Sequence, residues 1–106
     1  MTKPPKKIKI GNIDWAFRYN DEYFSSSTDS LGMCDVLNHI IGVNRGLEPL
    51  MEAEIAMHEC YHAICWTEGL TDSSTEEAYC SRGSKGWVML LDRNPHFREY
   101  WESLFI

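Results

Sequence analysis

Residues 49–69 read PLMEAEIAMHECYHAICWTEG, and this stretch decides the fold. Its apolar and histidine side chains recur with a helical period in two stripes: Leu50, Ala53, Met57, Tyr61 and Ile64, and Met51, Ile55, His58, His62 and Cys65. Two such stripes predict a helix that is buried on more than one side. Pro49 suits the first turn of a helix and Gly69 suits a C-terminal cap, so we expect the helix to run from about Pro49 to Glu68.

Within this helix, His58, Glu59 and His62 form the pattern His-Glu-x-x-His. Residues four apart lie one turn apart on the same helix face, so the two imidazoles can hold one zinc ion at about 2.0–2.1 Å each. Glu59 is rotated by about 100° from His58 and flanks the metal. There it can take a proton from a zinc-bound water. The pattern predicts one Zn²⁺ per chain, with Glu59 as the catalytic base.

A catalytic zinc site needs a third protein ligand and leaves the fourth position for water. Glu68, ten residues after His58, rotates away from the histidine face if the helix is unbroken. A second helix, expected over residues 73–93, returns beside the histidines if the two helices form an antiparallel hairpin. His62 lies about 10 Å before the end of the first helix, and this distance favours Glu77 as the ligand.

Glu76 and Cys80 remain alternative third ligands. The two glutamates also have a role that needs no metal, because Ser73-x-x-Glu76 and Ser74-x-x-Glu77 both have the pattern of a capping box. Cys80 is alternatively a small buried packing residue.

The residues before the first helix predict a small antiparallel sheet. Residues 7–10 and 13–20 alternate apolar and polar side chains, which is typical of strands. The Gly11-Asn12 pair between them suits a two-residue hairpin turn. Residues 21–32 are polar and serine-rich and predict a loop, and Val36 to Val43 predicts a third strand.

The expected fold class is therefore α+β, with the small sheet packed on the His-Glu-x-x-His helix, a second helix and a short C-terminal helix. Asn94-Pro95 opens the last helix, which places Phe97, Tyr100, Trp101 and Leu104 on one side. A chain of 106 residues with 43% hydrophobic composition fits one domain over residues 1–106, with residues 1–5 as a loose tail. Gly83 and Gly86 weaken the second helix but allow close packing.

The chain has a formal net charge of -6, and no Lys or Arg lies between Gly46 and Ser81. Its eight carboxylates in that stretch favour a divalent cation and repel phosphate backbones, so we expect no nucleic-acid partner. No apolar run approaches the roughly 20 residues of a membrane span. The four cysteines follow no zinc-knuckle or disulfide pattern and no signal peptide is visible, so we expect the cytosol.

The pattern His58-Glu59-x-x-His62 followed by Glu77 resembles the gluzincin group of zinc peptidases. The chain is also similar to small phage-encoded metallopeptidases and to the peptidase domains that cleave phage repressors. The similar stretch runs from about Ala53 to Phe97 and includes Met57-His58-Glu59-x-x-His62-Ala63-Ile64, Glu76-Glu77, Gly86 and Asp92-Arg93-Asn94-Pro95. The resemblance implies zinc, a glutamate third ligand, a minimal zincin-like fold and the cytosol of a bacterial host. The chain departs from the pattern at Cys80, Ser81 and Gly83.

The expected reaction is hydrolysis of a peptide or protein substrate. Glu59 accepts the proton of the zinc-bound water and passes it to the leaving amine. The strand Val36 to Val43 is expected to align an extended peptide by strand addition. Three side chains are candidates for stabilising the oxyanion, and the sequence does not choose among Tyr79, His39 and His96.

Two other functions are consistent with the same residues. In a non-catalytic, zinc-stabilised binding module that acts on a host or phage protein by contact, Cys80 would close the metal site and Glu59 would have no catalytic role. In an α+β interaction protein without a metal, the histidines would be ordinary helix residues. The sequence leaves the substrate and the oligomeric state undetermined.

Overall fold

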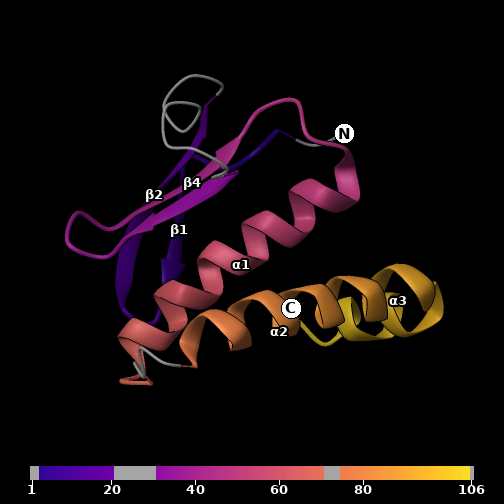
Figure 1. The fold of residues 1–106 in the computed structure, drawn as a ribbon. Coiled ribbons are helices and arrows are strands. Elements are labelled where there is room, and N and C mark those ends of the chain that lie inside the picture. Colours follow the sequence, from indigo (N-terminus) through magenta and orange to yellow (C-terminus); the bar gives the residue numbers. More distant parts are fainter. Residues whose placement is uncertain (1–2, 21–30, 71–74, 106) are drawn as a thin grey trace.

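The computed structural model describes residues 3–20, 31–70 and 75–105, which form an α+β fold (Figure 1). The elements are β1 (Lys7–Ile10), β2 (Ile13–Asn20), β3 (Gly32–Asp35), β4 (Ile40–Asn44), α1 (Pro49–Thr67), α2 (Glu76–Arg93) and α3 (Pro95–Ser103). Within the described residues, no helix combines the length and the apolar character needed to span a bilayer. Most of the predicted loop over residues 21–32, and the first two residues of the predicted tail, lie outside the described residues.

The sheet is mixed, with the strand order β1-β2-β4-β3. β1 and β2 are antiparallel, β2 and β4 are parallel, and β4 and β3 are antiparallel. The prediction of an antiparallel sheet is therefore wrong for its central pair. Alternating apolar and polar side chains identify the face that a strand buries, but the alternation is the same for a parallel and an antiparallel neighbour.

The predicted third strand, Val36 to Val43, is also wrong in its bounds. Residues 36–39 form a turn between β3 and β4, and only the second half of the predicted strand lies in β4. The Asp35 carboxylate accepts hydrogen bonds of 3.1 Å from the backbone N–H groups of Leu37 and Asn38. His39 has a φ of 56°, which reverses the chain direction. An aspartate that accepts hydrogen bonds from the backbone two and three residues further on forms turns, and the apolar neighbours of Asp35 hide this signal in the sequence.

The N-terminal hairpin is confirmed. Ile10 pairs with Ile13, so Gly11 and Asn12 form a two-residue turn, and Gly11 has a φ of 63°. A glycine with positive φ at the first turn position fits a type II′ hairpin. Trp15, on the second strand of the hairpin, lies in the core and is fully buried with Ile41 and Ala63.

α1 lies between the sheet and α2 (Figure 1). It contacts β1, β3 and β4 on one side and α2 on the other, so the predicted burial on more than one side is confirmed. The predicted stripes are only partly right, because the buried Glu59 and Ala63 belong to neither of them. Three stripe residues are exposed: Leu50, Met51 and Ile64.

Gly69 ends the helix with a φ of 70°. The Leu70 N–H donates to the Cys65 carbonyl at 2.7 Å and the Gly69 N–H donates to the Trp66 carbonyl at 3.4 Å, which is a Schellman cap. The predicted glycine cap is confirmed.

α2 begins at Glu76, with Thr75 at the N-cap and no side-chain capping hydrogen bond. The helix thus starts later than predicted, and the expected caps Ser73 and Ser74 lie outside the described residues. Gly83 packs against Tyr61, because an added Cβ would lie 3.1 Å from the tyrosine ring. Close packing is therefore confirmed for Gly83. It is wrong for Gly86, whose absent Cβ faces open space.

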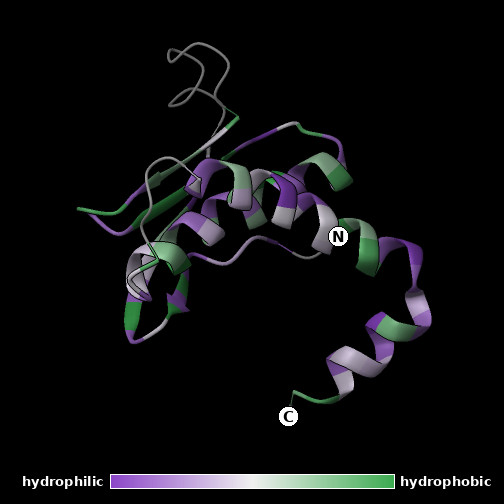
Figure 2. Cartoon of the chain, turned by 60° about the horizontal axis from the view of Figure 1, so that its bottom comes forward, coloured by the Kyte–Doolittle hydropathy of each residue, from purple (hydrophilic) through white to green (hydrophobic). Residues whose placement is uncertain are grey.

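α3 begins after the N-cap Asn94 and contacts only α2 among the described elements. None of its residues is buried. Figure 2 shows this C-terminal helix standing off from the layers formed by the sheet, α1 and α2.

Candidate metal centre

His58 and His62 lie one turn apart on α1 and point their rings at the same place. Their Nε2 atoms are 3.2 Å apart, and both side chains are mostly buried. The helix alone sets this arrangement, because residues four apart share a face.

The hairpin between α1 and α2 adds Glu77 to the two histidines. Its Oε1 lies 2.8 Å from His58 Nε2 and its Oε2 lies 3.2 Å from His62 Nε2. The structure therefore brings together the three residues favoured by the sequence as metal ligands. We call His58, His62 and Glu77 the ligand cluster.

The dimensions and chemistry of the ligand cluster fit a zinc ion. Ligand atoms at about 2.0–2.1 Å from a tetrahedral zinc are separated by about 3.3 Å. The three ligand atoms lie within 4.8 Å of one another, and the two nitrogens are 3.2 Å apart. Burial lowers the pKa of His58, which favours the neutral imidazole that binds metals. Two nitrogens and one carboxylate form a donor set typical of catalytic zinc.

Glu76 binds the other nitrogen of His62. Its Oε2 lies 2.6 Å from His62 Nδ1, and because an ionised carboxylate only accepts, Nδ1 donates. The proton on Nδ1 leaves the lone pair on Nε2, which faces the ligand cluster. Glu76 therefore orients a ligand, a role that the sequence reasoning missed. Its signal was the phase of about 100° between Glu76 and Glu77, which lets neighbouring carboxylates reach opposite nitrogens of one ring.

Glu59 lies on the side of α1 that faces β3. The residue is 9% exposed, and a Cβ added at Gly32 would lie 3.1 Å from its Cγ. Burial raises the pKa of Glu59 to about 7, the His62 charge opposes the rise, and the Glu77 charge adds to it. A carboxyl group with a pKa near neutrality is suited to accepting and returning a proton.

Cys80 is fully buried and belongs to a different group of side chains. The possible ligand atoms of Cys80, His62 and Glu76 lie within 4.8 Å of one another and form a second group. This group shares only His62 with the ligand cluster. Burial, and next the neighbouring Cys65, raise the pKa of Cys80 to about 12, which keeps the thiol protonated. Glu68 is the exposed C-cap of α1 and belongs to neither group.

The three candidates for the oxyanion donor lie away from the ligand cluster. His39 packs against Trp15 and Trp66, with ring centroids 5.0 and 5.6 Å away. His96 is on α3. Tyr79 is two residues after Glu77, so it is rotated by about 200° to the opposite face of α2.

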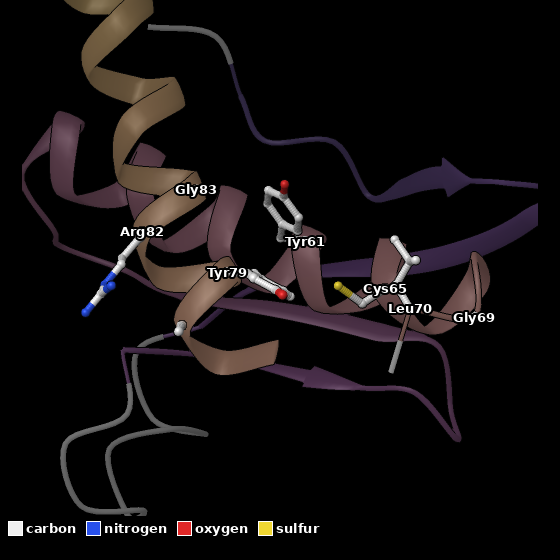
Figure 3. Close-up of a pocket in the computed structure, with 8 residues that line it drawn as sticks. Tyr61, Cys65, Gly69, Leu70, Tyr79, Arg82 and Gly83 are labelled. Atoms are coloured by element: carbon white, nitrogen blue, oxygen red, sulfur yellow. The ribbon is translucent and has the colours of Figure 1, made fainter. Parts of the chain in front are cut away.

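A pocket of about 620 Å³ opens on that opposite face (Figure 3). Tyr61 from α1 and Tyr79 from α2 line it, and the Arg82 side chain extends away from the two rings. No residue of the ligand cluster is among its described lining residues, so this pocket and the candidate metal centre are separate features.

Comparisons with known protein families, with curated proteins and with solved structures find no match for this chain.

Proposed function

We propose that the chain is a zinc-dependent metallopeptidase of a gluzincin-like, zincin-type fold that hydrolyses peptide bonds with Glu59 as general base. One observation carries the proposal. Two imidazole nitrogens and the Glu77 carboxylate converge at zinc-ligand separations, while a second, buried carboxylate lies one residue from His58.

In this proposal His58, His62 and Glu77 hold one zinc ion. Bound zinc supplies Lewis acidity, which lowers the pKa of water towards about 7 and polarises the scissile carbonyl. Glu59 takes the proton of the attacking water and passes it to the leaving amine. Glu76 keeps the His62 ring in the tautomer and orientation that binding requires.

The substrate strand needs an edge of the sheet near Glu59. β4, which contains the second half of the segment expected to align the substrate, is paired on both sides and offers no edge. β3 is an edge strand of the described sheet, and it contacts α1 beside Glu59. We therefore assign alignment of an extended peptide to β3.

Two features favour catalysis over a closed, structural metal site. Structural zinc sites usually have four protein ligands, and Cys80 groups with Glu76 rather than with His58 and Glu77. A structural site also has no need of a buried carboxylate next to a ligand.

All four cysteines are free thiols, which fits the reducing cytosol proposed as the compartment.

The test is Glu59→Gln, which keeps the shape of the side chain and removes its basicity. We expect near-stoichiometric zinc, an unchanged fold and a loss of hydrolysis of about 10²–10⁴-fold. Peptide libraries, and lysate proteins examined for new termini, provide the substrates, and chelation of zinc must stop the reaction. Glu54→Gln, a nearby glutamate of α1 outside the ligand cluster, is the matched control.

Equal rates for Glu59→Gln and the wild type, in an assay that chelation stops, would refute the general-base role. Stoichiometric zinc without cleavage of any substrate by the wild type would instead favour the binding module.

A further inference from the structure

The end of α2 and the whole of α3 carry large apolar side chains that the fold leaves exposed. We define the aromatic face as Trp87, Leu90, Phe97, Tyr100, Leu104 and Phe105. These side chains are 37–67% exposed. Trp87 and Leu90 lie on α2, Phe97 and Tyr100 lie on α3, and Leu104 and Phe105 follow its end. Figure 2 shows α3 standing away from the layers of the sheet, α1 and α2.

The rings of the aromatic face are ordered by one another rather than by the core. Trp101, which is half-buried at their centre, has ring centroids of Trp87 at 6.1 Å, Phe97 at 6.3 Å and Phe105 at 5.1 Å. α3 contacts no described element other than α2. Stacked and edge-to-face rings form a firm surface, which lowers the entropy lost when a partner binds.

The exposed area matches the requirement of a small dimer. Six large side chains that are about half exposed present roughly 600 Å² of apolar surface. A patch of this size is at the upper end for a monomer and commonly marks an interface. Two such faces in contact bury about 1,200 Å², which reaches the range of stable protein interfaces.

The charge distribution favours a second copy of the same chain. Residues 82–105 contain four Lys or Arg and three Asp or Glu, so this segment is nearly neutral in a chain with a net charge of -6. Contact through the stretch between Gly46 and Ser81, which holds no Lys or Arg, would instead bring two acidic surfaces together. Contact through α3 keeps those surfaces apart. A near-neutral segment also offers no cationic surplus for nucleic acid or an anionic membrane.

We infer that the chain forms a closed, twofold dimer in which the aromatic face of one copy packs on the aromatic face of the other. A self-complementary patch satisfies both copies at once and leaves neither aromatic face free to bind a third copy. The inference does not depend on the peptidase proposal, because it involves neither the ligand cluster nor Glu59.

Sedimentation velocity of the full chain from about 1 to 100 µM tests the inference. The wild type should sediment at twice the mass of one chain at the upper concentrations. Tyr100→Glu and Leu104→Glu place a charge in the contact and should each raise the dimer dissociation constant by about 10–100-fold. Both residues are more than half exposed, so the fold should tolerate the changes, and circular dichroism of each variant verifies this.

Leu37→Glu is the matched control, because Leu37 is 87% exposed in the turn between β3 and β4 and should leave the dimer intact. A wild type that stays monomeric at 100 µM would overturn the inference. Dimers that persist in both charged variants, or open-ended association that never saturates, would overturn it as well. Binding of the monomer to neutral phosphatidylcholine vesicles, abolished by Tyr100→Glu, would assign the face to lipid instead.

Discussion

The two ends of α2 carry different kinds of side chain and make different kinds of contact. At its N-terminus, Glu76 and Glu77 each reach a histidine of α1, and Cys80 and Ser84 are buried behind them. Towards its C-terminus the last buried residue is Val88, and none of α3 is buried. Carboxylates and imidazoles interact only with a suitable partner at a specific distance, whereas apolar rings gain from any apolar contact area. One end of the helix can therefore specify chemistry, and the other can specify association.

The largest effect should follow from removing a ligand at the polar end. His62→Ala removes one zinc ligand and leaves Glu76 without its partner, so we expect at least about 100-fold weaker zinc binding and a lower melting temperature. His96→Ala, on α3, is the control and should keep one zinc per chain. Elemental analysis and thermal unfolding with and without a chelator measure both. Wild type that carries no zinc and melts unchanged with chelator would refute the metal centre.

A graded effect should separate the three candidates on α2. Glu77→Ala should weaken zinc binding most, because it removes a ligand. Glu76→Gln should weaken it by about 10–100-fold, as is usual for a residue that orients a ligand. Cys80→Ala should leave zinc affinity nearly unchanged. Competition with a chromophoric chelator gives the order. If Cys80→Ala loses the zinc, the second group of side chains is the metal site and the closed-site alternative gains.

The smallest effect compares two glycines within α2. Gly86→Ala fills open space in a helix and should raise the free energy of unfolding by about 0.8–1 kcal/mol. Gly83→Ala gains the same helix propensity but crowds Tyr61, since its Cβ would lie 3.1 Å from the ring. We expect Gly83→Ala to show no net gain or a loss. Urea unfolding measures both, and equal stabilisation by the two alanines would contradict the close packing at Gly83.

Local sequence patterns predicted the parts of the molecule that local geometry determines. The period of α1, its glycine cap and the Gly11-Asn12 turn all depend on residues within one or two turns of each other. The spacing of His58 and His62 belongs to the same class. The preference for Glu77 over Glu76 came from the distance of about 10 Å between His62 and the end of the first helix.

The features that sequence reasoning missed depend on contacts between distant segments. β2 and β4 pair in parallel, but the alternation of apolar and polar side chains would be the same for antiparallel pairing. Glu76 gained its role because a hairpin places it beside the far nitrogen of His62. The pattern placed Phe97 and Tyr100 on one side of a helix, but only the fold decides that this side stays exposed.

Gly32 sets the separation between β3 and α1. A Cβ at this position would lie 2.6 Å from Ile55 Cγ2 of α1 and 2.8 Å from the Gly42 carbonyl oxygen of β4, so the packing of β3 against α1 leaves no room for a side chain here. For a peptide paired with β3, this close contact would fix the distance between the peptide and α1. In the proposed peptidase, the distance between the scissile bond and Glu59 would therefore depend on backbone pairing and not on the side chains of the peptide. Recognition of this kind selects extended conformation and register before it selects sequence.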